Sequence, residues 1–142
     1  MKTIKELIGK KGQEVWSVEP DATVYASIEL LAEKGVGALM VIEDGKPVGI
    51  ISERDYARKV ILEGRSSKST PVRDIMSTHV IHTSPDRSVE ECMTLMTKNK
   101  IRHLPVMDGE QLVGVVSIGD LVKATISEQQ STIEQLERYI SS

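Results

Sequence analysis

Two stretches decide the fold of this 142-residue chain: Gly49-Ile50-Ile51-Ser52-Glu53-Arg54-Asp55 and its echo, Gly114-Val115-Val116-Ser117-Ile118-Gly119-Asp120. Each begins as an apolar run typical of a buried strand and then places an aspartate three residues after a serine. Around them, residues 15–59 align with residues 80–124 at a constant offset of 65 positions, without a gap and with eleven identities. A period of this length, present only twice, indicates two paired units with one core and argues against a solenoid.

Each repeat reads as strand, helix, strand, strand and helix. This order predicts an α+β fold of two β-α-β-β-α units related by a pseudo-twofold axis. Short extended entries are expected at 15–18 and 80–83, before the Pro-Asp turns. The Asp-Gly turn signals at 44–45 and 108–109 are displaced by one position between the repeats, so we expect the two hairpins to differ in turn type.

Helix caps mark the first helix of each repeat. Thr23 is the expected cap in the first repeat, where Gly35 ends the helix. In the second repeat, Ser88 and Glu91 have the spacing of a capping box.

Composition divides the chain into five segments. They are an N-terminal helical extension (1–14), repeat one (15–64), a linker with its lead-in (65–79), repeat two (80–126) and a C-terminal amphipathic helix (127–142). The stretch 64–71 is polar and reads as a surface linker, and 72–76 reads as a short helical turn. Thr3 and Glu6 have the spacing to cap a small N-terminal helix.

The C-terminal helix carries one apolar stripe on an otherwise polar sequence. Ile126, Ile133, Leu136 and Ile140 follow a 7-3-4 spacing among Glu and Gln. The stripe either packs onto its own domain or forms a dimer contact, and the sequence leaves both open.

Bulk composition excludes several classes. With 39% hydrophobic and 27% charged residues, a net charge of −3 and a pI near 5.7, the chain has no overall attraction to nucleic acid or acidic membrane. Lys10-Lys11 and scattered arginines are poor support for nucleic-acid binding, because one Trp, three Tyr and no Phe offer little stacking surface. The single cysteine, Cys92, reads as a core residue. No signal peptide or membrane span is recognisable, so a cytoplasmic location is expected.

The serine–aspartate stretches, here called elbows, admit two compatible interpretations. Ser-x-x-Asp is a variant of the capping box, so pure helix capping explains all four residues. A serine hydroxyl and free backbone N–H groups at a helix start also suit a phosphate, and a neighbouring carboxylate suits the vicinal hydroxyls of a ribose. Together these groups indicate a nucleotide.

Two tandem copies of this pattern resemble the cystathionine-β-synthase (CBS) domain pair, or Bateman module. The resemblance covers about residues 15–124, with both copies of the Gly–hydrophobic–x–Ser–x–x–Asp signature intact, and the flanking stretches are similar to small stand-alone bacterial members. It implies two clefts between the repeats that bind adenosine nucleotides: AMP or NAD(H) first, with ATP, ADP or S-adenosylmethionine as further candidates, and no metal. It also implies two chains that meet as a flat disc.

The resemblance assigns roles to eight residues. Asp55 and Asp120 would hold a ribose, Ser52 and Ser117 would meet ribose or phosphate, Gly37 and Ala38 would admit an adenine to the backbone, and Arg102 and His103 would meet phosphates. The contrast between Gly-Ala and Arg-His leaves open whether both clefts bind one ligand equally well.

Weaker candidates lie beside the elbows and at the strand entries. Arg54 and Arg58 suit phosphate as forked donors, although such arginines are often solvated or paired, as Arg58 would be with Glu63 or Glu53. His79 and His82 have no carboxylate or cysteine at metal spacing. Trp16 reads as a core plug, with base stacking as the alternative.

The predicted function is therefore non-catalytic. The sequence shows no recognisable nucleophile, metal or Walker motif, and a duplicated site with matching residues suits binding better than chemistry. We expect a homodimeric sensor of energy or redox state that signals to an effector protein, with no role at nucleic acid or membrane. The alternative is a structural dimerisation or interaction module without a physiological ligand.

Overall fold

The chain forms two compact units. The computed structural model describes residues 2–11 and 14–141; the side chains of Lys10 and Lys11 fall outside the described part. The first-repeat unit comprises Val15–Val80, and the second-repeat unit comprises Met1–Glu14 together with Ile81–Ser142. Within the described residues, no helix combines the length and apolarity needed to cross a membrane.

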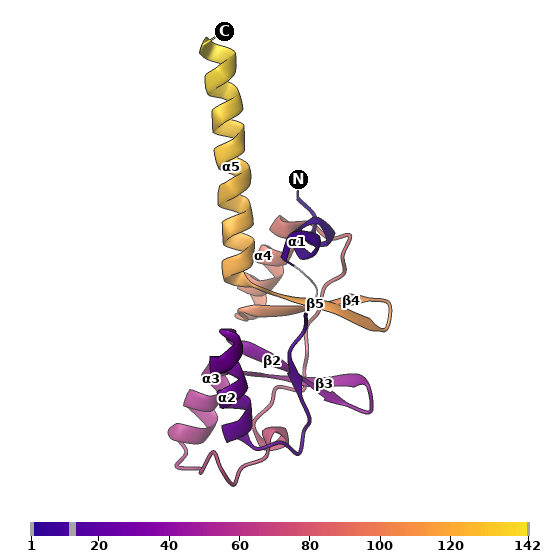
Figure 1. Ribbon diagram of the computed structural model, residues 1–142, viewed down its shortest axis with the longest axis vertical. Helices are drawn as coiled ribbons and strands as arrows, with labels where there is room; N and C mark the ends of the chain where they lie inside the picture. The colour runs from indigo at the N-terminus through magenta and orange to yellow at the C-terminus, as the bar shows by residue number, and fades with distance from the viewer. Residues whose placement is uncertain (1, 12–13, 142) are drawn as a thin grey trace. The chain divides into compact units, whose positions relative to one another are not determined.

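The first-repeat unit is a three-stranded sheet covered by helices (Figure 1). Its strands are β1 (Ser17–Val18), β2 (Ala38–Glu43) and β3 (Lys46–Ser52), with β1 parallel and β3 antiparallel to β2. Its helices are α2 (Val24–Lys34), α3 (Glu53–Tyr56), a π-helical turn η1 (Ala57–Ile61) and a 3-10 turn η2 (Val72–Asp74). The core includes Leu39 and Ile51 from the sheet and Val60 from η1.

The second-repeat unit repeats this plan with two strands. It contains α1 (Ile4–Lys11), α4 (Val89–Asn99), β4 (His103–Asp108), β5 (Gln111–Ser117) and α5 (Ile118–Ser141). Strands β4 and β5 pair antiparallel, and Figure 1 shows α5 running on well beyond α4. The core includes Ile4 from α1, Cys92 and Met96 from α4, and Leu104 from β4.

The extended entry of the second repeat is shorter than expected. In the first repeat, the Met40 N–H donates to the Trp16 carbonyl at 3.2 Å and helps to form β1. The position equivalent to Met40 is Pro105, which has no N–H to donate. Only Thr83 therefore pairs with β4, through an isolated bridge to Val106.

The predicted caps are confirmed. The Thr23 side chain accepts from the Ala26 N–H, and Gly35 ends α2 with φ +65°. Ser88 and Glu91 form a complete capping box at α4.

The two hairpins differ in turn type, as the displaced Asp-Gly dipeptides indicate. Both Asp44 (φ +52°) and Gly45 (φ +76°) adopt positive φ, the pattern of a type I′ turn. In the second hairpin, where β4 ends at Asp108 and β5 begins at Gln111, Gly109 (φ +63°) is positive and Glu110 is not, the pattern of type II′.

The lead-in segments are exchanged between the repeats. The segment before repeat two packs on repeat one, where Val72 and Ile75 are almost fully buried; the segment before repeat one packs on repeat two, where Ile4 is fully buried. Equivalent backbone hydrogen bonds hold both segments. On repeat one, the Val72 N–H donates to the Ala22 carbonyl (2.8 Å) and the Arg73 N–H donates to the Pro20 carbonyl (3.0 Å). On repeat two, the Ile4 N–H donates to the Arg87 carbonyl and the Lys5 N–H donates to the Pro85 carbonyl (both 2.8 Å). Each unit is thus completed by chain from the other repeat's side.

Candidate functional site

Both elbows are complete capping boxes. The Ser52 Oγ accepts from the Asp55 N–H (3.2 Å), while the Ser52 N–H donates to Asp55 Oδ2 (2.9 Å). At the second elbow the Ser117 N–H donates to Asp120 Oδ2 (2.9 Å), and the Asp120 N–H donates to Ser117 Oγ (3.1 Å). The capping interpretation is therefore confirmed at both helix starts. All four residues stay partly exposed.

The structure brings the predicted strand-start residues to the elbows. Ala38 is the register partner of Ser52, and the Gly37 carbonyl accepts from the Glu53 N–H at 3.1 Å. The same arrangement recurs in the second-repeat unit, with His103 opposite Ser117 and the Arg102 carbonyl accepting from the Ile118 N–H at 2.8 Å. Each unit thus collects four candidate residues around one helix start.

Two arginines, one within the first elbow and one just after it, have fewer polar contacts than the serine and aspartate. Arg54 lies in α3 and is partly exposed, and Arg58 lies in η1 and is exposed. Among the residues that the structure describes, neither forms an ion pair. Glu63, an expected partner of Arg58, instead lies 3.5 Å from Arg65 Nε. Both arginines remain candidate phosphate ligands.

Lys59 is a residue of the first elbow that the sequence analysis missed. Its Nζ lies 3.2 Å from Asp55 Oδ1 and donates to the Ile75 carbonyl at 3.0 Å. The i,i+4 spacing of Asp55 and Lys59 is the signal that could have revealed this pair. The equivalent of Lys59 in the second repeat is Ala124, which is buried.

A local change in helix winding explains why Lys59 is partly exposed whereas the aligned residue Ala124 is buried. In α5 the core-facing residue is Ala124, whereas after the first elbow it is Val60, one position later in the alignment. The π-helical turn η1 contains the extra residue that moves this inward position. It therefore frees Lys59 from the core and lets its ammonium group reach Asp55.

A surface groove of ≈ 520 Å³ lies beside the first elbow. Its lining is mostly apolar, from α2 and the loop that follows it, and Glu53 and Tyr56 border it on the elbow side. Its residues are Ile28, Leu31, Ala32, Gly35, Val36, Gly37, Glu53 and Tyr56. A mostly apolar groove beside a helix start has the character of a binding site for a flat ring.

Trp16 packs partly against the core of its unit, and the Lys34 Nζ lies 4.2 Å from its ring centroid. The core interpretation of Trp16 is thereby supported. His79 and His82 are both exposed. In the described part of the chain, no three His, Cys, Asp or Glu side chains gather as metal ligands would.

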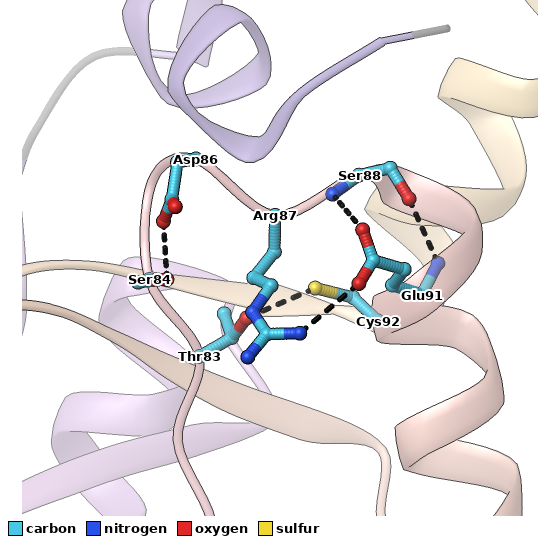
Figure 2. A network of polar contacts seen from close by, with 7 residues as sticks. All are labelled: Thr83, Ser84, Asp86, Arg87, Ser88, Glu91 and Cys92. Atoms are coloured by element: carbon cyan, nitrogen blue, oxygen red, sulfur yellow. Dashed lines mark hydrogen bonds and ion pairs between the residues drawn. The ribbon is translucent and has the colours of Figure 1, made fainter.

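A network of polar contacts lies at the start of α4 and joins Arg87, Ser88 and Glu91 (Figure 2). Hydrogen bonds from the Ser88 N–H and Arg87 lower the pKa of Glu91, and a hydrogen bond from Ser84 lowers the pKa of Asp86. Burial raises the pKa of the Cys92 thiol, which lies 3.2 Å from Thr83 Oγ1. Cys92 is therefore a core thiol, in agreement with its place in the apolar row of the helix.

With this geometry in place, comparison with known proteins identifies the family. The CBS domain matches twice, over residues 4–62 and 72–127, and the chain belongs to the CBS-domain family. It is 41% identical over 148 residues to the CBS domain-containing protein CBSX3, mitochondrial, of Arabidopsis thaliana, a match that covers 97% of this chain and 71% of that protein. The CBS domain pair is a regulatory module.

Solved structures share the fold. A CBS-domain protein from Burkholderia ambifaria matches with a TM-score of 0.87 and 46% identity, over 90% of this chain and 96% of that one. The CBS domain pair of protein MJ0100, solved with 5′-methylthioadenosine and S-adenosyl-L-methionine, matches with a TM-score of 0.80 and 22% identity, over 90% and 98%. The predicted tandem CBS fold is confirmed.

Proposed function

We propose that this protein is a non-catalytic regulatory module that binds an adenosine nucleotide, with AMP or NAD(H) favoured, at its two elbows. The bound nucleotide reports the energy or redox state of the cell to an effector protein. The chain acts as a homodimer.

One observation carries this proposal: each elbow collects a serine, an aspartate, the first residue of a neighbouring strand and the residue just before that strand. In both units the carbonyl of the residue before the strand, Gly37 or Arg102, accepts a hydrogen bond from the first N–H of the helix. The start of the strand therefore lies close to the aspartate carboxylate, which accepts from the serine N–H. This group of residues can offer hydrogen bonds to a ribose, and the helix N-terminus can bind a phosphate. The MJ0100 pair, which has this fold, was solved with two adenosine compounds, and this supports the ligand class.

The residues around each elbow differ, which bears on ligand choice. The first elbow has Gly37 and Ala38 beside the ≈ 520 Å³ groove, so an adenine ring can approach the backbone. The second has Arg102 and His103, which suit the phosphates of a nucleotide. We propose that a nucleotide at the first elbow is held mainly through its base, and a nucleotide at the second elbow mainly through its phosphates.

The second candidate function, a dimerisation module without a ligand, also has an observation in its favour. Both aspartates already serve as capping groups, and Asp55 is further held by Lys59. A carboxylate with these partners has a structural task whether or not a nucleotide binds.

Calorimetric titration with AMP, ATP, NAD⁺, NADH and S-adenosylmethionine separates the two functions. A true ligand at about 100 times its Kd also stabilises the fold by roughly 2.7 kcal/mol, which raises the melting temperature. A chain that gives no heat and no shift with any of the five is the ligand-free module.

The variants Asp55→Asn and Asp120→Asn test the residues. Asparagine keeps an oxygen for the cap and removes the charge that a ribose would meet. Each variant is expected to weaken the nucleotide's binding at its own elbow by about tenfold or more. Glu91→Gln is the matched control, because Glu91 holds the same capping-box position in α4, outside the elbows. If all three variants bind equally well, the aspartates only cap.

A further inference from the structure

Helix α5 exposes a row of apolar side chains along most of its length. The row begins at Val122, close to the start of the helix, and reaches Ile140. Its exposed fractions are 39% for Val122, 60% for Ile126, 49% for Ile133, 56% for Leu136 and 81% for Ile140. Five large apolar groups on one helix at this exposure need an explanation, since single exposed apolar residues are common and contiguous rows are not.

This row is a different face from the one that α5 turns to its own unit. The inward face is marked by Leu121 and Ala124, which are buried in the second-repeat core, and by Thr125, which reaches Met93 of α4. At about 100° per residue, the centre of the exposed row lies roughly a quarter-turn around the helix from the inward face. The row is therefore not a continuation of the α4 contact.

The spacing of the row is that of a coiled-coil seam. Positions 122, 126, 129, 133, 136 and 140 alternate by four and three, and this order fixes Ile126, Ile133 and Ile140 as a positions. Val122, Gln129 and Leu136 are the d positions. Among parallel coiled coils, isoleucine at a with leucine at d favours two strands over three or four; here all three a positions carry isoleucine, and one d position, Leu136, carries leucine.

The polar d position agrees with the same arrangement. In a parallel, in-register pair Gln129 faces the Gln129 of the other helix, and the two amides can hydrogen-bond to each other. In an antiparallel pair with a facing d, Gln129 would lie against Ile133 and leave its amide among apolar groups. The e and g positions flank the seam, and between residues 126 and 140 Glu137 is the charged residue at these positions. In a parallel pair Glu137 lies beside Thr132 of the other helix, so no like charges face each other there.

We propose that α5 pairs with the α5 of a second copy of this chain as a parallel two-stranded coiled coil, with its seam from Val122 to Ile140. The proposal does not depend on a nucleotide. The resulting contact is isologous and closes as a twofold dimer. The helix that begins at the second elbow is then the same helix that holds the dimer together.

Disulfide cross-linking tests both the partner and the direction. Ile140→Cys places a thiol on the seam, and Arg138→Cys places one on the outer face of the same turn; Cys92 is kept in both because it is buried. Under mild oxidation of the full chain, Ile140→Cys is expected to form a covalent dimer about tenfold faster or more than Arg138→Cys. An antiparallel pair would place the two Ile140 residues at opposite ends of the seam and give no such product.

Charges on the seam provide the second arm. The pair Ile133→Glu/Leu136→Glu, added to Ile140→Cys, is expected to slow the cross-link by about tenfold or more, because it buries two carboxylates in the seam. The matched control Ser131→Glu/Gln135→Glu adds the same charge on the outer face and is expected to leave the rate unchanged. Circular dichroism confirms that both variants remain folded.

Two results would overturn the proposal. One is an equal cross-linking rate for the Ile140→Cys and Arg138→Cys variants. The other is a rate that seam and outer-face charges change equally. In either case, light scattering identifies the occupant: a monomer means that the row is covered by its own chain, and a dimer means that the chains pair through another surface.

Discussion

The two elbows share their capping hydrogen bonds and their strand register, and they differ in the side chains beside them and in the helix that follows. Ser52 with Asp55 and Ser117 with Asp120 make the same hydrogen bonds at the same positions. The first is followed by a π-helical turn and a lysine that holds its aspartate. The second is followed by a regular 24-residue helix. Duplication has therefore preserved the cap, while the residues that would choose a ligand have diverged.

The same contrast extends to the chain beyond each elbow. The chain leaves η1 for an exposed stretch at residues 61–66, whereas α5 continues into an exposed apolar row. The chain after the first elbow thus stays within the first-repeat unit, whereas the second elbow begins a long helix that exposes an apolar row. A signal that leaves through α5 would arise at the second elbow.

The largest expected effect tests whether the two cores are equivalent. Leu39 and Leu104 align in the repeats and are 1% and 0% exposed. Leu39→Ala and Leu104→Ala are each expected to cost about 2–5 kcal/mol, from lost burial and a cavity. Amide hydrogen exchange should show the loss of protection first in the unit that carries the change. If either variant loosens both units equally, the chain unfolds as one body and the comparison of units fails.

A smaller effect is expected at the two elbow-strand glycines. A Cβ at Gly49 would lie 2.8 Å from Met76 Sδ and 2.9 Å from the Ser77 carbonyl, which is fixed by its bond to the Ile50 N–H. The three atoms nearest to a Cβ at Gly114 all belong to the Ile8 side chain, and the closest is its Cδ1 at 3.1 Å. Gly49→Ala should cost about 1–3 kcal/mol, and Gly114→Ala should cost less than half of that. Urea unfolding of both variants measures the difference; equal losses would show that the Ser77 backbone yields as easily as a side chain.

Features written in local residue patterns were predictable. The caps at Thr23 and Ser88, the difference between the two hairpin turns and the caps at the elbows depend on neighbours within a few positions, and these predictions are confirmed. The family followed from the duplicated elbow. Gly37, Ala38, Arg102 and His103 came from the family resemblance, and the strand register places them beside the elbows.

Features that depend on distant parts of the chain were not predictable. The lead-ins at Ile4 and Val72 align across the repeats at 68 positions rather than 65, and each packs on the opposite repeat, so the internal alignment gives no sign of them. The i,i+4 spacing of Asp55 and Lys59 hints at their ion pair, but the π-helical turn that keeps Lys59 out of the core has no recognisable local pattern. Pro105, which has no N–H to donate, explains why the extended entry is reduced to Thr83, but only once the structure shows that this entry pairs with β4.

A gain in stability of about 1 kcal/mol is expected where the repeats differ at a helix end. Gly35 and Lys100 are equivalent, and both end their helices in the left-handed conformation, with φ +65° and +56°. A side chain is strained there and glycine is not. Lys100→Gly should therefore raise the unfolding free energy of the second-repeat unit, and Lys98→Gly, within the same helix, should lower it. Thermal melts measure both; a loss at Lys100 would mean that its side chain contributes more than the strain costs.

The smallest expected effect is a pH dependence confined to one of two matched helix starts. Thr23 and Ser88 cap α2 and α4, but the position three residues later is Ala26 in one and Glu91 in the other. The pKa of Glu91 is lowered, chiefly by hydrogen bonds from Ser88 and Arg87. Its contribution is thus fully present above the unfolded pKa of about 4.3 and is lost as pH falls through the lower folded value.

The difference in melting temperature between the wild type and Glu91→Gln should accordingly be largest near neutral pH and shrink steadily below about pH 4. Ala26→Glu should install the same acid-sensitive increment at α2, because it completes the box that Thr23 begins. Glu29→Gln, an exposed change within α2, controls for the loss of a surface charge. A difference in melting temperature that stays the same from neutral pH to pH 3 would mean that ionisation of Glu91 adds no stability, and that the two helix starts are electrostatically equivalent.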